Sequence, residues 1–231
     1  MLQEAAHLGV YQPVVESALA DLTAHDIVPR IWQEDYTVWK PSPTEITNRL
    51  GWLTIAKRMK EHLPAIQALV EAVTDEGYTD VLWLGMGGSS LAPDVFHHVF
   101  EEREDGLRLR VLDSTDPGAV RAAAERLDLR RKLFVVATKS GGTAETLSFF
   151  KYFYHLMAEM LSDDDAPETL DEEVGAHFVA VTDEGSKLDA LGQELHFRHI
   201  FRNDPNIGGR FSVLSHFGMV AAGLLGVDIE K

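Results

Sequence analysis

Cysteine is absent from the 231-residue sequence. Its absence excludes disulfide bonds, thiolate nucleophiles and metal sites built on cysteine. Basic residues are also scarce, because 21 lysines and arginines face 37 aspartates and glutamates and leave a net charge of -16. A protein with this charge repels nucleic-acid backbones and anionic membrane surfaces at long range, so neither is expected as a partner.

Long hydrophobic runs are missing as well. No apolar stretch approaches the roughly 18 residues that indicate a membrane-spanning helix, and residues 1–10 include an acidic side chain but no lysine or arginine. We therefore expect neither a membrane span nor a secretion signal, and a cytoplasmic location. The hydrophobic fraction of 45% is typical of a folded globular protein.

The first 76 residues carry a helical pattern. The order Ser-Pro-Thr-Glu from Ser42 to Glu45 supplies an N-cap, a proline at the first helical position and a glutamate at the third. This pattern predicts a helix that begins there. Pro64 interrupts or restarts the pattern before a further apolar stretch. Residues 1–76 are therefore predicted to form a helical N-terminal region.

After Gly77 the pattern changes to short apolar runs that alternate with helical stretches. The runs are typical of strands, and they cover residues 81–84, 109–112, 133–137, 178–181 and 199–201. The stretches with helical character cover residues 93–100, 119–127, 143–161 and 187–195. This alternation predicts an α/β domain over residues 77–231, a three-layer α/β/α sandwich with a five-stranded parallel sheet. The acidic tract 162–173 is interpreted as a solvated connection.

Two loops that follow predicted strands have the composition of anion sites. Gly85–Ser90 is Gly-Met-Gly-Gly-Ser-Ser, and Thr138–Thr143 is Thr-Lys-Ser-Gly-Gly-Thr. At the carboxyl edge of a parallel sheet, such loops present backbone N–H groups and helix N-termini to an anion. Glycine allows a close approach of the backbone, and hydroxyl groups add donors. The second loop favours a monophosphate over a nucleoside triphosphate, because its lysine precedes the glycines and the P-loop order is absent.

Two other interpretations of these loops stay open. The first loop could bind a dinucleotide, with Asp113 on the ribose. The third glycine of that motif falls on Ser90, however, and Asp113 lies 28 residues after Gly85 rather than about 20. Alternatively, each loop is a tight turn without a ligand. The occurrence of two such loops on neighbouring strands favours a ligand.

A third loop, Gly208–Ser212, places an arginine after paired glycines. Arg210 is either an ordinary surface arginine or a donor at the carboxyl edge of the sheet that stabilises a developing oxyanion. His196 and His199 are three residues apart, but no third candidate ligand accompanies them. We therefore expect no metal site.

Taken together, these loops resemble those of the glucose-6-phosphate isomerase family and its sugar isomerase domain. The matching segments lie within residues 81–218. They are the glycine-rich segment Gly85–Ser90, the Asp-Pro turn Ser114–Pro117, the phosphate loop Thr138–Thr146 and the Gly-Gly-Arg-Phe/Tyr-Ser signature Gly208–Ser212. The helices before residue 77 resemble, more weakly, the isomerase part of bifunctional transaldolase/glucose-6-phosphate isomerase proteins.

The resemblance implies an enzyme that interconverts glucose 6-phosphate and fructose 6-phosphate through a cis-enediol intermediate. It implies no metal or organic cofactor, and a homodimer in the full-length protein. By the same resemblance Gly88 and Ser89 contact the sugar or its phosphate, and Arg210 stabilises the enediolate. The residues implied to form the phosphate site are Thr138, Ser140 and Thr143, with Lys139 lining the loop. Thr138 stands where many family members have serine, which preserves the hydroxyl group.

The general base, the ring-opening histidine and the lysine of the family belong to later segments that this sequence does not match. We therefore expect the sequence to be the N-terminal, phosphate-binding half, without the second catalytic domain and inactive alone. Glu145 is the one local carboxylate considered as a base, and a glutamate in the first turn of a helix more often caps or orients it. A non-catalytic, regulatory sugar-phosphate-binding domain is the alternative function.

Overall fold

The computed structural model describes residues 8–100, 106–125, 128–162 and 169–230. Its centre is a sheet of five parallel strands in the order β2-β1-β3-β4-β5. The strands are β1 (Asp80–Gly85), β2 (Arg108–Leu112), β3 (Lys132–Ala137), β4 (Phe178–Asp183) and β5 (His199–Asn203). Each strand contains one of the five apolar runs, so the predicted parallel sheet is confirmed.

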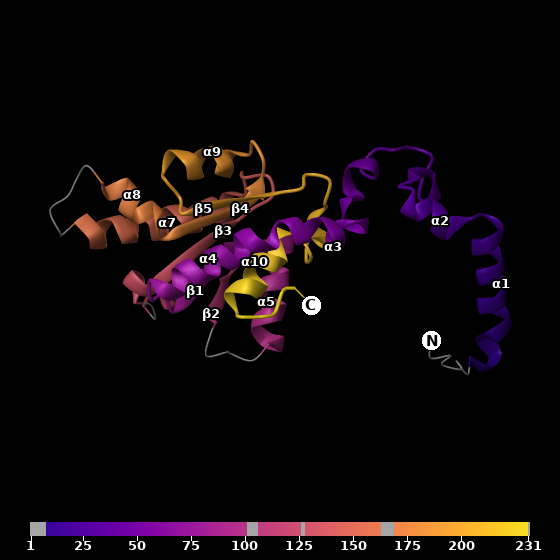
Figure 1. Cartoon of the computed structure of the whole chain (residues 1–231), viewed down its shortest axis with the longest axis horizontal. Coiled ribbons are helices and arrows are strands. Elements are labelled where there is room, and N and C mark those ends of the chain that lie inside the picture. Colours follow the sequence, from indigo (N-terminus) through magenta and orange to yellow (C-terminus); the bar gives the residue numbers. More distant parts are fainter. Residues whose placement is uncertain (1–7, 101–105, 126–127, 163–168, 231) are drawn as a thin grey trace.

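Helices cover both faces of this sheet (Figure 1). One face packs against α4 (Leu63–Asp75), α5 (Leu91–Val99) and α10 (His216–Leu224), and the other against α6 (Pro117–Glu125), α7 (Ala144–Leu161), α8 (Leu170–Gly175) and α9 (Lys187–Glu194). Trp83 of β1 belongs to the first core, and its neighbours Leu82 and Leu84 belong to the second. The three-layer α/β/α sandwich is confirmed. Among the described helices, none is both long and apolar enough to cross a bilayer.

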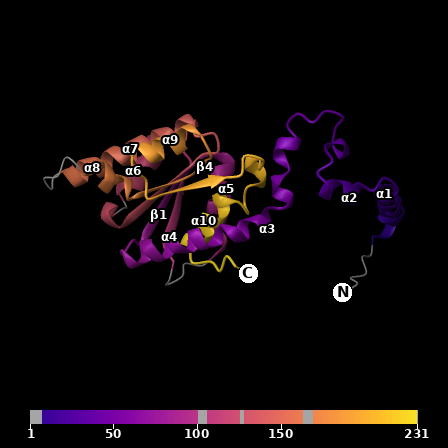
Figure 2. The ribbon, with the colours of Figure 1, turned by 45° about the horizontal axis from the view of Figure 1, so that its top comes forward.

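The N-terminal region is helical, as predicted, but its first part lies away from the sheet. α1 (Gln12–Ala24) and α2 (Ile27–Trp32) contain no buried residue, and two views show them projecting from the body (Figures 1 and 2). In contrast, α3 (Ile55–Arg58) and α4 contribute to the first core. The domain boundary at residue 76 stays a prediction, and α4 packs against the sheet of the domain that follows it.

The expectation that a helix begins between Ser42 and Glu45 is wrong. The structure forms short 3-10 turns instead, at Thr47–Arg49 and Gly51–Leu53. Glu45 has a positive φ of 61°, so the chain leaves the helical conformation there. Its carboxylate binds Arg49 at 2.6 Å rather than capping a helix.

Long-range contacts of the same segment explain this difference. Leu50 forms an antiparallel bridge with Ile207. The N–H of Gly51 donates to the carbonyl of Asn206 at 3.0 Å. These contacts fix the backbone in a conformation set by a segment far away in the sequence, and they override the local capping pattern.

The acidic tract 162–173 is a connection only in part. Residues 163–168 of this tract lie outside the described residues, but α8 begins within it at Leu170. Val174 of α8 is completely buried in the second core, and the hydroxyl of Tyr154 donates to Asp171 at 2.8 Å. Three acidic residues in the first turn of α8 interact favourably with the helix dipole. For this segment the interpretation as a solvated connection is therefore wrong.

Deleting residues 1–40 should leave the free energy of unfolding within about 0.5 kcal/mol of the intact chain, because no residue from 8 to 40 is buried and exposed residues contribute little. As a control, Ile66→Ala in α4 should lower that free energy by about 2–5 kcal/mol, because the Ile66 side chain is completely buried. Urea unfolding measured by circular dichroism tests both changes. A large loss on deleting the segment would mean that it packs against the body in solution.

His216 begins α10 and is buried among other rings. Its residue is 5% exposed, and its ring centroid lies 4.9 Å from that of His62 and 5.4 Å from that of Phe201. Its Nδ1 atom has no hydrogen-bond partner within the described residues. Burial, assisted by the nearby His62, lowers the pKa of His216 from 6.5 to about 4.

Acid should therefore destabilise the fold through His216, alongside His177 and His199, whose pKa values burial also lowers. The unfolded chain binds a proton at His216 at a higher pH than the folded chain does. The free energy of unfolding should fall by on the order of 3 kcal/mol as the pH decreases from 6.5 to about 4. His216→Phe should reduce the slope of the pH dependence in this window, whereas the same change at the exposed His155 should leave the slope unchanged. Urea titrations across the window measure the slope, and an unaltered slope in His216→Phe would contradict the assignment.

Candidate functional site

The carboxyl ends of β1 and β3 lie side by side at one edge of the sheet. β2 flanks β1 and β4 flanks β3, so the order of the strands reverses between β1 and β3. At such a reversal, the loops after the two strands run to opposite faces and leave a crevice in which ligands bind. These two loops are Gly85–Ser90 and Thr138–Thr143. The prediction that they follow neighbouring strands is confirmed.

The glycine-rich loop after β1 is held by its own strand. Gly87 has a φ of 54°, a conformation that favours glycine. The indole N–H of Trp83, within β1, donates to the carbonyl of Ser89 at 2.8 Å. The hydroxyl of Ser90 donates to the carbonyl of Gly87 at 3.1 Å. These bonds fix the loop, and neither of them uses the Ser89 hydroxyl.

The loop that carries Arg210 lies directly against the glycine-rich loop. A Cβ on Gly88 would lie 2.6 Å from the carbonyl carbon of Gly209, too close for any real side chain. The hydroxyl of Ser212 lies 2.7 Å from the Gly209 oxygen and 3.3 Å from the Gly88 oxygen. The two loops therefore meet backbone to backbone, one residue from the exposed Arg210.

The loop after β3 gathers hydroxyl groups at the start of α7. Thr138 Oγ1 and Thr143 Oγ1 lie 2.8 Å apart, and Thr143 is the N-cap residue of α7 but makes no side-chain bond to the helix amides. Thr146 Oγ1, in the first turn, is buried and has no partner within the described residues. First-turn amides without a side-chain cap attract anions through unused donors and the helix dipole. The loop therefore presents hydroxyl and amide donors suited to an anion.

Ser140 and Gly141 form the turn of this loop. Gly141 has a φ of 67°, and a Cβ there would lie 2.6 Å from the backbone nitrogen of Leu188. Only glycine therefore fits between the loop and α9. Ser140 is exposed, and its hydroxyl accepts a bond from the N–H of Gly142 at 3.3 Å.

The Lys139 ammonium is bound by the protein itself. It forms an ion pair with Asp183 at the end of β4 and donates to the carbonyl of Pro205 at 3.0 Å. The two charged side chains are 23% and 16% exposed. Burial raises the pKa of Asp183 against the opposing effect of Lys139. Lys139 thus connects the loop after β3 to the end of β4 and to the segment after β5.

The other sequence candidates lie apart from these contacts. Glu145 is exposed in the first turn of α7. Asp116 caps α6, because its Oδ1 accepts a bond from the N–H of Ala119 at 2.9 Å. His196 and His199 belong to no cluster of three metal-ligating side chains among the described residues.

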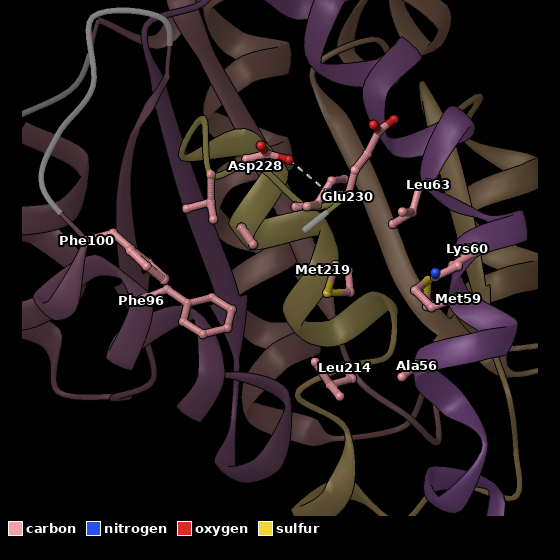
Figure 3. A pocket seen from close by; sticks show the side chains of 13 residues that line it. Ala56, Met59, Lys60, Leu63, Phe96, Phe100, Leu214, Met219, Asp228 and Glu230 are labelled. Carbon is pink, nitrogen blue, oxygen red and sulfur yellow. Dashed lines mark hydrogen bonds between the residues drawn. The ribbon is translucent and has the colours of Figure 1, made fainter. Parts of the chain in front are cut away.

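A separate cavity of about 350 Å³ lies between α5, α10 and the segment around α3 and the start of α4. Figure 3 shows that the side chains around it are mainly apolar, among them Met59, Leu63, Phe96 and Met219. It contains neither of the two glycine and hydroxyl loops. The edge of the sheet that carries these two loops is therefore the better candidate for an anionic ligand.

Comparison with known proteins places this geometry in a family. The model of the phosphoglucose isomerase family matches residues 51–230. The chain belongs to the phosphoglucose isomerase family. The glucose-6-phosphate isomerase of Prochlorococcus marinus (strain NATL2A) is 34% identical over 158 residues, which are 68% of this chain and 28% of that protein. The glucose-6-phosphate isomerase of Rubrobacter xylanophilus is 30% identical over 223 residues, 94% of this chain and 48% of that protein.

Solved structures agree with this membership. A hypothetical protein from Thermus thermophilus superposes with a TM-score of 0.74 at 26% identity, over 95% of this chain and 48% of that one. A glucose-6-phosphate isomerase from Chlamydia trachomatis has a TM-score of 0.55 at 25% identity, over 87% of this chain and 34% of that one. The chain spans less than half the length of each of these four proteins.

Sequence reasoning missed two residues that hold the site together. Asp183 follows an apolar run at the carboxyl end of a parallel strand, which is a position where polar residues reach a ligand crevice, so a signal existed. Trp83 lies inside a buried run, and no sequence pattern indicates that its indole N–H binds the next loop.

Gly88→Ala should lower the free energy of unfolding by about 1–3 kcal/mol, because the added methyl group forces the two loops apart. Gly209→Ala is the matched control on the other side of the same contact. A Cβ on Gly209 would lie 3.9 Å from the Gly88 Cα, which is an ordinary separation. Urea unfolding of both variants measures the difference. Equal stability of the two would mean that the loops are not in contact in solution.

Proposed function

We propose that this chain is the phosphate-binding part of an aldose–ketose isomerase that interconverts glucose 6-phosphate and fructose 6-phosphate. The observation that carries the proposal is the meeting of two donor-rich loops, after β1 and β3, with the loop of Arg210. A phosphate site alone would suit many ligands. An arginine one residue from the glycine-rich loop adds a donor for charge that develops during a reaction.

In this proposal the phosphate lies at the N-terminus of α7. The residues that hold it are Thr138, Lys139, Ser140 and Thr143, together with first-turn amides of α7. Lys139 has one N–H left after its bonds to Asp183 and Pro205. Gly88 and Ser89 contact the sugar, whose far end carries C1 and C2. Isomerisation proceeds through a cis-enediol, and the guanidinium of Arg210 stabilises the enediolate oxygen.

The proton transfer between C1 and C2 also needs a general base. Asp183 and Asp204, at the same edge, are each paired with a cation, and Glu145 occupies the first turn of α7. We therefore propose that the base and the ring-opening acid come from protein segments beyond the described residues. On this view the chain binds sugar phosphates but does not turn them over alone. The full-length protein would be a cytoplasmic homodimer that acts in glycolysis and gluconeogenesis.

A regulatory sugar-phosphate-binding domain is the second candidate, and the exposed Arg210 separates it from the first. A sensor has no need for a group that recognises the enediolate. An isomerase should bind an aldonate phosphate, in which a carboxylate replaces C1 and C2, through this guanidinium.

Arg210→Ala should weaken the binding of arabinonate 5-phosphate by about tenfold or more, because a charge-assisted hydrogen bond is lost. The same change should weaken the binding of sorbitol 6-phosphate by less than about threefold. Arg210→Lys, which keeps the charge without the planar fork, should fall between the wild type and Arg210→Ala. Isothermal titration calorimetry measures the affinities, and a coupled assay with fructose 6-phosphate measures turnover in the same preparation. The expected result for the unaltered chain is binding without turnover.

Other outcomes decide between the candidates. Equal losses for the two ligands would favour the sensor. Turnover by the chain alone would place a base within it and overturn the proposed division of the site. A folded sample that binds neither ligand would refute the proposed function.

A further inference from the structure

Lys139 connects the phosphate loop to the loop of Arg210. Its Nζ pairs with Asp183, the last residue of β4, and donates to the carbonyl of Pro205 at 3.0 Å. Pro205 lies in the segment between β5 and Arg210. Since β3, β4 and β5 are consecutive neighbours in the sheet, one ammonium group spans the ends of three strands.

Backbone contacts reinforce the tie between β4 and the phosphate loop. The N–H of Asp183 donates to the carbonyl of Lys139 at 3.2 Å. The hydroxyl of Thr182, the preceding residue, donates to the carbonyl of Thr138 at 2.7 Å. The end of β4 therefore fixes the first two residues of the loop, and the Asp183 carboxylate fixes the lysine side chain.

The surroundings of this ion pair make the Lys139 ammonium depend on the Asp183 carboxylate for its position. Both side chains are mostly removed from solvent, and a partly buried pair contributes more than a pair in water. Asp204 lies close enough to raise the pKa of Asp183, and Arg58 pairs with Asp204. Without the Asp183 charge, the ammonium would keep only its bond to the Pro205 carbonyl of these two contacts, and it would leave its place between the loops.

We propose that Asp183 is a positioning residue for the sugar-phosphate site, acting through Lys139 to hold the phosphate loop in register with the loop of Arg210. The inference rests on the proposed function for its effect on ligand binding. It goes beyond that function because Asp183 itself contacts no ligand. The carboxylate directs the remaining N–H of Lys139 and keeps Pro205, and with it the chain leading to Arg210, at a fixed distance.

Asp183→Asn keeps the size of the side chain and removes its charge. We expect it to weaken fructose 6-phosphate binding by about tenfold, because the loss of one partner of a buried pair releases the other. The double variant Lys139→Met/Asp183→Asn should bind no more weakly than Lys139→Met alone, since the two residues act as one unit. Calorimetry provides the affinities for this double-mutant cycle.

Asp80→Asn is the matched control. Asp80 begins β1 at the opposite edge of the same sheet and pairs with Lys132, the first residue of β3, and with Arg108. In urea unfolding Asp80→Asn should lose about as much stability as Asp183→Asn. It should keep the affinity of the unaltered chain for fructose 6-phosphate. Unchanged affinity in Asp183→Asn, or additive losses in the double variant, would overturn the positioning role.

A readout without ligand separates this inference from the proposed function. Asp183→Asn should speed amide hydrogen exchange in both residues 138–143 and residues 204–212, whereas Asp80→Asn should not. If the unaltered chain binds no sugar phosphate but the exchange result holds, the tie stands and the proposed function fails. If exchange increases in neither loop, the tie itself is refuted.

Discussion

The close backbone contact between Gly88 and Gly209 is the constraint on which the site depends. The two glycines belong to loops after β1 and β5, and β3 and β4 separate these strands in the sheet. The β5 loop must therefore cross the carboxyl edge to reach the glycine-rich loop. This approach requires a residue without a side chain at position 88, and the Ser212 hydroxyl then lies within reach of both carbonyl oxygens. In this way the backbone beside Arg210 is brought from the end of the last strand to the glycine-rich loop after β1.

Sequence patterns predict this arrangement wherever it rests on local signals. Strands buried on both faces give unbroken apolar runs, and glycine and hydroxyl residues mark the loops after them. The prediction fails where a distant contact decides the conformation. The capping pattern at residues 42–45 forms no helix because residues 50 and 51 bond to residues 206 and 207. The pairing of Lys139 with Asp183 is equally distant, and no spacing rule indicates which cation a strand-end carboxylate meets.

The acidic composition is compatible with an anion site because the site does not depend on net charge. At this edge Lys139 and Arg58 are paired with Asp183 and Asp204, so they add little free positive charge. The donors that remain are hydroxyl groups, the first amides of α7 and the one N–H of Lys139 not bound to Asp183 or Pro205, all of which act over a few ångströms. The field of the other acidic groups is screened beyond about 8 Å at physiological salt. A compact phosphate can thus approach these donors, whereas an extended polyanion would also meet the acidic surface.

In the proposed function, binding of the phosphate by these loops would also orient the rest of the substrate. In a hexose 6-phosphate the reacting carbons are at the end opposite the phosphate, so phosphate binding can orient C1 and C2 against Arg210. The accuracy of this orientation depends on how rigid the loops are. Gly141 packed on α9, Trp83 bonded to Ser89 and the contact between Gly88 and Gly209 all restrict loop motion. An arginine stabilises an enediolate but cannot generate one, because it does not accept a proton at ordinary pH. In the proposed function this chain therefore binds the substrate and stabilises charge, and proton abstraction falls to a carboxylate or imidazole placed opposite Arg210.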